Sequence, residues 1–241
     1  MQMGTMTSTE IFKKAHPGDR TLLTEVESKA LVQEAGIPVV PTHLARNKSQ
    51  AARIAQALGL PVVMKVVSPE VVHKSDVGGV KTGLRSLRQV RAAYDDLVAS
   101  TRKALPSASI LGVAVQRMAP PGVEVILGAF RNPEFGHVVM FGLGGVMVEV
   151  LQDVSLRLVP LTRRDARQMV REIKGFSLLN GYRQHPPCDI LALEEALLNL
   201  SLFLEKHPEV KELDLNPVFC YPQGILAVDA RVVLEEVNPN T

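Results

Sequence analysis

The chain has 241 residues, of which 46% are hydrophobic and 22% are charged, and its formal net charge is +2. This composition is sufficient to bury the core of one large domain or of two packed lobes, so it predicts a globular protein. Basic residues are scattered among acidic ones, aromatic residues make up only 4%, and Trp is absent, so nothing points to a nucleic-acid partner.

Targeting and redox features of the sequence favour the cytoplasm. No apolar run reaches the length of about 18 residues that a membrane span needs, and residues 1–20 lack the apolar stretch of a signal peptide. We expect residues 1–20 to form a flexible N-terminal segment. Cys188 and Cys220 lie far apart without a Cys-x-x-Cys pattern, which argues against a zinc site and against the disulfide framework of a secreted protein.

The next elements predict an α/β lobe over residues 21–115. Thr24, with Glu27 three residues later, is typical of a capping box and opens a helix. Ser49 is expected to cap the following helix, which ends at Gly59. Hydrophobic periodicity predicts three further elements, namely a strand over 62–67, a helix from Leu87 and a strand over 110–116.

A segment of connector composition, Arg-Met-Ala-Pro-Pro-Gly over 117–122, interrupts this pattern. A second lobe is predicted over residues 116–236. Its expected elements are strands over 123–130 and 137–141, helices that open at Thr162 and Asp189, and a hairpin that joins 213–219 to 225–229. The fold class is therefore α/β, with two lobes on either side of a connector.

One stretch of the first lobe suits phosphate chemistry. Lys65 lies inside an apolar strand and needs an anionic or polar partner to offset its desolvation, for which a nucleotide phosphate is a natural choice. Gly78 and Gly79 would let backbone N–H groups approach an anion, and a neutral imidazole at His73 would accept or transfer a phosphoryl group. Taken singly, each feature has an ordinary alternative: a lysine that reaches the sheet edge, a turn, or a surface histidine.

Motifs in the same order as in a known family extend over most of the chain. They are His73-Lys-Ser-Asp-Val-Gly-Gly-Val, Phe141-Gly-Leu-Gly-Gly145 with Val148-Glu149, Asp214-Leu-Asn216-Pro217, and Val228-Asp229-Ala230. Together they resemble the ATP-grasp subunit of ADP-forming acetyl-CoA synthetases, a family related to succinyl-CoA synthetase. The resemblance implies an ATP-grasp fold that holds ATP or ADP between two lobes, and a separate CoA-binding partner subunit in a hetero-oligomer, with no nucleic acid or membrane involved.

The resemblance also implies a role for each matching position. His73 would be the phosphohistidine, Asp214 would help to orient it, and Arg157 would stabilise charge on the transferring phosphoryl group. Asn216 and Asp229 would bind Mg²⁺. The nucleotide-binding residues would be Lys65, Ser75, Gly78 and Gly79 in the first lobe, Gln116, Met118 and Ala119 at the adenine, Glu124 at the ribose, and Gly144 and Gly145 in a phosphate loop.

The local patterns support these roles while leaving alternatives open. Glu124 alternates with Ile126 and Gly128, so it points to a cleft or simply to water. Asp214 lies two residues before Asn216 and shares its side of a strand, although a turn-initiating Asp is the alternative. The glycine loop at Gly144 and Gly145 is also compatible with a plain tight turn.

Two further patterns are interpreted as ordinary surface features. The spacing of Glu149, Asp153 and Arg157 is typical of a solvated helical face, which is the alternative to a site role for Arg157. His137 is expected to lie at the surface rather than in a site.

The mechanism implied by the resemblance is a phosphoryl relay. The partner would convert acyl-CoA and phosphate into an acyl phosphate, a histidine on the partner would take the phosphoryl group, and His73 would receive it and pass it to ADP. The alternative is a stand-alone or regulatory ATP-binding module related to those fused to protein acetyltransferases. A carboxylate ligase that needs no phosphohistidine is a third possibility. A phosphorylatable histidine together with Asp214, Asn216 and Asp229 favours the relay enzyme, because a pure sensor does not need one.

Overall fold

The computed structural model describes residues 7–15, 20–71, 73–145, 153–183 and 186–236. They form two compact units with mixed α/β structure. Unit 1 comprises residues 1–23, 27–39 and 121–241, and unit 2 comprises residues 24–26 and 40–120. Each unit is built on an antiparallel sheet, which confirms the α/β prediction. No helix in the described ranges has the length and apolar character that crossing a membrane requires.

Unit 2 contains a four-stranded sheet in the order β1-β4-β2-β3. Its elements are β1 (Thr42–Ala45), α3 (Lys48–Leu58), β2 (Val62–Val67), β3 (Val80–Leu84), α4 (Leu87–Ala104) and β4 (Gly112–Arg117). Val62 and Met64 pack with residues of α3 and α4 in one hydrophobic core. Since side chains alternate along a strand, Lys65 lies on the opposite face of β2.

Helix α3 begins two residues earlier than the sequence suggested. Asn47, and not Ser49, is its N-cap, because the Asn47 side chain accepts a hydrogen bond from the Gln50 N–H at 2.9 Å. Strand β2 and the start of α4 lie where they were predicted, and Ser86 caps α4 by accepting from the Gln89 N–H.

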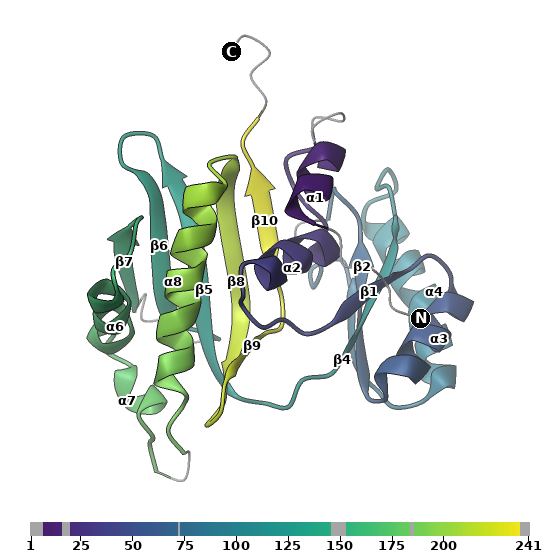
Figure 1. The fold of residues 1–241 in the computed structure, drawn as a ribbon. Coiled ribbons are helices and arrows are strands. Elements are labelled where there is room, and N and C mark those ends of the chain that lie inside the picture. The colour runs from purple at the N-terminus through teal and green to yellow at the C-terminus, as the bar shows by residue number, and fades with distance from the viewer. Residues whose placement is uncertain (1–6, 16–19, 72, 146–152, 184–185, 237–241) are drawn as a thin grey trace. The chain divides into compact units, whose positions relative to one another are not determined.

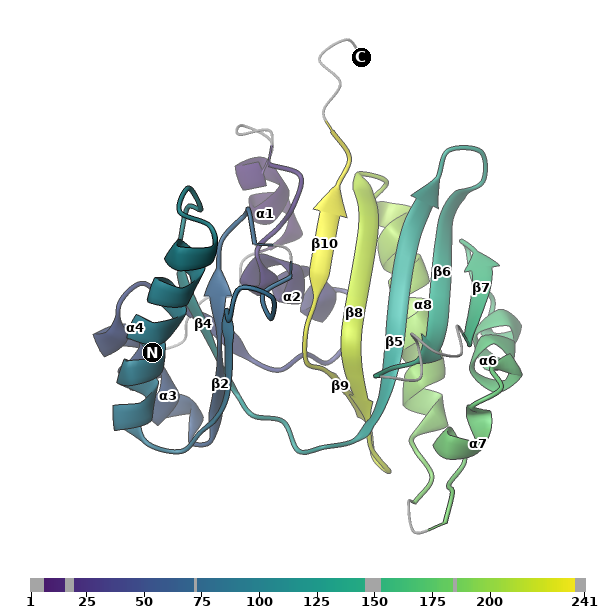
Figure 2. The same cartoon turned by 180° about the vertical axis from the view of Figure 1, so that it is seen from behind.

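Unit 1 is built on a six-stranded sheet in the order β10-β8-β5-β6-β7, with β9 paired to β8. Its strands are β5 (Val123–Asn132), β6 (Gly136–Leu143), β7 (Val154–Leu158), β8 (Val210–Cys220), β9 (Ile225–Ala227) and β10 (Arg231–Leu234). Helices α6 (Arg163–Glu172) and α8 (Ile190–Lys206) cover one face, and α7 (Phe176–Leu179) lies between them in the chain. Figure 2 shows the strands from the other face, in front of α8.

The core of unit 1 follows from alternation in the strands and helical spacing in α8. Val125 and Leu127 of β5 and Phe141 of β6 pack in one cluster with Leu193 and Leu197 of α8. The predicted helix starts are confirmed, because Thr162 caps α6 in a capping box with Asp165 and Asp189 caps α8.

The N-terminal segment differs from its prediction. Helix α1 (Ser8–Ala15) lies within the segment expected to be flexible, and Ile11 and Ala15 are buried in the core of unit 1. Helix α2 (Glu25–Glu34) belongs largely to unit 1 as well, so the first lobe is smaller than residues 21–115. Glu34 accepts two hydrogen bonds from Ser8, through its N–H at 2.7 Å and its hydroxyl at 2.8 Å, which ties α1 to α2.

Two surface interpretations are corrected by the structure. Arg157 lies in strand β7 and not on a helix, whereas Glu149 lies outside the described residues. His137 is buried, and its Nε2 lies 2.6 Å from the carbonyl oxygen of Val210. The hydrogen bond satisfies the buried imidazole, so His137 has a structural role. The polarity of His137 and the glycine turn beside it had suggested a surface position, which the structure contradicts.

Candidate functional site

The buried lysine of unit 2 has a carboxylate partner within the chain. Lys65 Nζ lies 2.7 Å from Glu25 Oε1, and the two side chains are 8% and 0% exposed. The need for an anionic partner was predicted correctly, but Glu25 meets it and was not identified. Its only local signal is an acidic residue in the first turn of a helix, which does not indicate a partner on β2.

Glu25 also contacts the loop that carries His73. Lys74 Nζ lies 3.5 Å from Glu25 Oε2, and the Lys74 side chain is 21% exposed. We call Glu25, Lys65 and Lys74 the Glu25 cluster. Within unit 2 it joins strand β2 to the residue next to His73, and His73 itself is exposed to solvent.

The double glycine in this loop shapes the turn. The Gly78 N–H donates to Ser75 O at 3.1 Å, and the Gly79 N–H donates to Lys74 O at 2.7 Å. A Cβ at Gly79 would lie 2.6 Å from Val66 Cγ1 and 2.8 Å from Lys74 O, and Gly78 has a φ of +64°. Both N–H groups therefore donate to carbonyl oxygens within the loop, whereas the sequence had suggested that they face an anion. Ser75 of the same loop is exposed.

The residues expected at the adenine lie at the end of β4 and just beyond it. Gln116 is buried, and its Oε1 accepts a hydrogen bond from the Thr42 hydroxyl at 3.1 Å. The Met118 N–H donates to Pro61 O at 3.0 Å, and its side chain is exposed. Ala119 is half-buried and precedes the boundary between the units, which falls after Pro120. Their adenine role stays a prediction.

In unit 1 the structure brings Glu124 and the glycine loop together. The Gly144 N–H donates to the Glu124 carbonyl at 2.7 Å. A Cβ at Gly144 would lie 2.9 Å from Glu124 Cβ, and one at Gly145 would lie 3.0 Å from Glu124 Oε2. Only glycine permits so close an approach, and Gly145 has a φ of +67°. The exposed Glu124 carboxylate thus lies against the loop.

The oxygen-bearing residues of β8 lie on the sheet face opposite the core. Leu213 and Leu215 are buried in the core, so Asp214 and Asn216 point to the other face. Asp214 is paired with Gly128 of the neighbouring strand β5, so these two residues share a face of the sheet. Glu124 lies four positions before Gly128 on β5, and because side chains alternate along a strand it lies on the same face. We call it the open face of the unit 1 sheet.

The charges around Asp214 favour a cation. Burial raises the pKa of Asp214, the carboxylates of Asp229 and Glu212 raise it further, and Arg231 opposes them. Asp229, which follows β9, therefore lies close enough to Asp214 to repel it. Mg²⁺ prefers hard oxygen ligands and takes only one or two from protein carboxylates, so Asn216 and Asp229 beside Asp214 fit this ion.

The described residues contain no group of three or more His, Cys, Asp and Glu side chains arranged to hold a metal by themselves.

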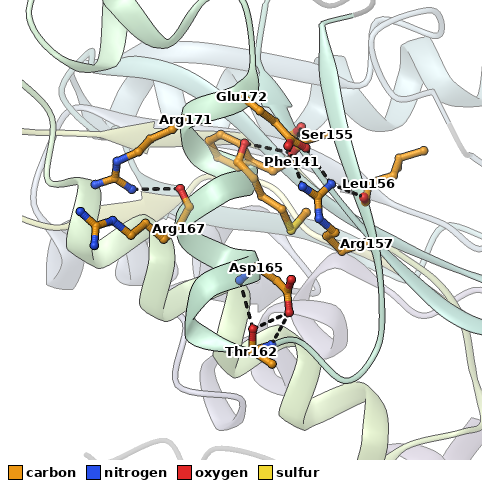
Figure 3. Close-up of polar contacts among 10 residues, drawn as sticks. Phe141, Ser155, Leu156, Arg157, Thr162, Asp165, Arg167, Arg171 and Glu172 are labelled. Atoms are coloured by element: carbon orange, nitrogen blue, oxygen red, sulfur yellow. Dashed lines mark hydrogen bonds and ion pairs between the residues drawn. The ribbon is translucent and has the colours of Figure 1, made fainter.

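Arg157 does not join this group. It is paired in the sheet with Val139, whose side chain lies in the core, so Arg157 lies on the helix-covered face, opposite Asp214. Its guanidinium makes two hydrogen bonds to the Glu172 carboxylate of α6, at 2.7 and 2.6 Å (Figure 3). The hydrogen bond to Glu172 raises the pKa of Arg157. The predicted role at the phosphoryl group is therefore corrected to an ion pair between β7 and α6.

Comparison with known proteins identifies the family of the chain. The model of the ATP-grasp domain matches residues 14–234. The beta subunit of ADP-forming acetate–CoA ligase I from Pyrococcus furiosus is 44% identical over 93% of this chain and 97% of its own length. ADP-forming acetate–CoA ligase I from Archaeoglobus fulgidus is 47% identical over 87% of this chain, which spans only 30% of that longer relative.

A solved structure agrees with these relatives. The acetyl-coenzyme A synthetase 1 of Candidatus Korarchaeum cryptofilum matches with a TM-score of 0.84 and 44% identity, over 95% of this chain and 100% of that chain. It was determined in complex with coenzyme A and Mg-AMPPCP, with its phosphohistidine segment pointing towards the nucleotide-binding site.

Proposed function

Since the chain belongs to the ATP-grasp domain family, we propose that it is the nucleotide-binding subunit of an ADP-forming acyl-CoA synthetase. It would bind ATP or ADP with Mg²⁺ and relay a phosphoryl group through His73. What supports this proposal is that Asp214 and Asn216 lie on the open face of the unit 1 sheet, with the Asp229 carboxylate among the causes that raise the pKa of Asp214.

His73 suits the relay because it is exposed on a loop, where imidazole has no packing role. In the direction of ATP synthesis, the unprotonated ring nitrogen of His73 attacks the phosphorus of a phosphoryl group carried by the partner subunit. The new N–P bond forms as the bond from phosphorus to the partner's carrier group breaks, and that group leaves with the bonding electron pair. The terminal phosphate oxygen of ADP then attacks phosphorus, and the N–P bond breaks. Lys74 is held by Glu25, so the Glu25 cluster would limit the movement of the residue beside His73.

Asn216 and Asp229 would hold Mg²⁺, which when bound neutralises phosphate charge during phosphoryl transfer. Asp214 would orient the imidazole of His73 by accepting its other ring proton. Glu124 would accept hydrogen bonds from the ribose hydroxyls beside Gly144 and Gly145. Lys65 would stabilise phosphate oxygens, and its partner Glu25 would set the position of its ammonium group.

The acyl-transfer chemistry would reside on a separate CoA-binding subunit. The Pyrococcus relative is a beta subunit, and the Archaeoglobus relative is a single chain more than three times as long as the matching region. We propose that such a partner joins this chain in a hetero-oligomer. Free thiols at Cys188 and Cys220 suit a reducing compartment, so a cytoplasmic location belongs to the same proposal.

The test is acid-labile labelling of the chain. Incubation with γ-labelled ATP and Mg²⁺ should give a label that is stable in alkali and labile in acid, as expected for a phosphohistidine. His73→Ala should lack it, whereas His43→Ala, a control on β1 of the same unit, should retain it. A label that persists in folded His73→Ala would refute the relay, and nucleotide binding without any label in the wild type would favour the regulatory alternative.

A further inference from the structure

The only two cysteines of the chain lie side by side in unit 1. Cys188 directly precedes α8, Cys220 ends β8, and 32 positions separate them in the sequence. The Cys188 thiol donates a hydrogen bond to the carbonyl oxygen of Cys220 at 3.9 Å, and the Cys220 thiol donates one to the carbonyl oxygen of Tyr221 at the same distance. The side chains are 8% and 2% exposed. Both cysteines are free, so this proximity does not come from a disulfide bond.

Backbone hydrogen bonds hold the two segments together on either side of the thiols. The Asp189 N–H donates to Tyr221 O at 2.7 Å, and the Gly224 N–H donates to Asp189 Oδ2 at 2.8 Å. On its other side, the Cys188 N–H donates to Leu179 O at 2.8 Å. The sulfur atoms are thus brought together by the fold before any ligand arrives, which lowers the entropic cost of binding both at once.

The pair does not lie in a closely packed interior. Both cysteines line a cavity of about 340 Å³, together with Gly122, Leu178 and Pro186. The other lining residues are Pro121, Val123, Tyr221 and Pro222, so no charged side chain lines the cavity in the described part of the chain. Its walls offer two sulfur atoms in apolar surroundings, which suit a soft ligand better than a hard cation or an anion.

The two thiols differ in acidity. The hydrogen bond from Cys220 lowers the pKa of the Cys188 thiol, while the hydrogen bond to Cys188 and burial raise the pKa of the Cys220 thiol. We therefore expect Cys188 to be the more nucleophilic of the two sulfurs, since the thiolate is the nucleophile. Cys220 would follow once the first bond has formed.

We propose that Cys188 and Cys220 form a two-thiol binding site for a thiophilic metalloid or soft metal centre, for which trivalent arsenic is the defining chemistry. An organoarsenic oxide would react with both thiols. Two S–H bonds and the arsenic–oxygen bond break, two As–S bonds form, and the oxygen leaves as water with the two protons. Arsenic stays trivalent, so no oxidant is required. This site is independent of the proposed nucleotide chemistry.

The test uses phenylarsine oxide and the full-length chain, reduced with a phosphine. Intact mass should show one phenylarsenic group per monomer with loss of two hydrogens, and both thiols should become unreactive to a thiol reagent. The adduct should resist excess monothiol and be released by a dithiol. Because the chain has no other cysteine, a monomeric adduct of this kind must bridge Cys188 and Cys220.

Single variants separate two-point binding from reaction at one thiol. Cys188→Ser and Cys220→Ser should each bind the arsenical on the order of a hundredfold more weakly under monothiol competition, because the second bond forms at a high effective concentration. Circular dichroism checks the fold, and the corresponding alanine variants replace any serine variant that fails to fold. The proposal is overturned if the folded wild type gains no arsenic, keeps a reactive thiol after one equivalent, or loses no affinity when either cysteine is removed.

Discussion

The ion pair between Glu25 and Lys65 should contribute strongly to the stability of the chain. Its atoms lie 2.7 Å apart and its side chains are 0% and 8% exposed, so Glu25→Gln would leave the Lys65 ammonium buried without that carboxylate charge. Breaking a buried pair by removing one partner costs about 3–5 kcal/mol. Lys74, at 3.5 Å from the same carboxylate, would lose its contact too. We expect the free energy of unfolding, measured by urea titration at pH 7, to fall by at least about 3 kcal/mol.

A matched control lies on the surface of the same unit. Lys48 Nζ and Asp95 Oδ2 are 2.9 Å apart, but their side chains are 54% and 59% exposed. Asp95→Asn should therefore cost less than about 1 kcal/mol. Because the two pairs have similar lengths, the difference between the variants reports burial together with the second contact of Glu25, to Lys74. Adding Lys65→Met to Glu25→Gln should recover part of the loss, since the buried ammonium charge is then removed. Equal losses in Glu25→Gln and Asp95→Asn, or no recovery in the double variant, would refute this reasoning.

Three further predictions concern unit 1. Burial raises the pKa of Asp214 above its ordinary value of 3.8, so the stability contributed by this group is complete below pH 3.8 and is lost as pH rises through the raised pKa. Asp214→Asn should therefore gain stability relative to the wild type as pH rises from 3.5 to 7 in urea titrations. Asp229→Asn should weaken magnesium-dependent nucleotide binding by about tenfold or more, measured by calorimetry, and an unchanged titration would remove Asp229 from the site. Arg157→Ala should leave labelling of His73 intact while it lowers the unfolding temperature, and lost labelling in the folded variant would restore Arg157 to the reaction.

Local sequence predicts an element well when its apolar residues are buried and its polar residues are exposed, or when all of its residues are buried. Strand β2 is apolar throughout except for Lys65, follows a proline, and runs from Val62 to Val67 as expected. Strand β7 was missed because its polarity is reversed. Its apolar residues Leu156 and Leu158 are exposed, whereas Ser155, which precedes Leu156, is buried. The four-residue spacing of Glu149, Asp153 and Arg157 instead suggested a helix. No local signal indicated that Arg157 lies on the face of the sheet that the helices cover.

The predictability of the site depends on how far apart its residues lie in the sequence. Asp214 and Asn216 were placed on one face from strand alternation alone, because two positions suffice to set their directions. Glu25 and Lys65 are 40 positions apart, and their contact depends on how α2 meets β2. Cys188 and Cys220 similarly meet only through the pairing of the α8 start with the end of β8. Local pattern gives the direction of a side chain, whereas tertiary packing selects its partner.

The environment of Asp214 also supports, in energetic terms, the proposal that the open face of the unit 1 sheet is a functional surface. A carboxylate whose pKa is raised by burial and by neighbouring carboxylates costs folding free energy whenever it is ionised. An amide of the same shape would avoid that cost, so folding alone does not account for an aspartate there. A bound cation would reverse the balance, because opposite charge favours the ionised form. If Mg²⁺ and nucleotide narrow the stability gap between the wild type and Asp214→Asn at pH 7, the ion acts on this carboxylate, whereas a gap that stays constant would confine Asp214 to a role without metal.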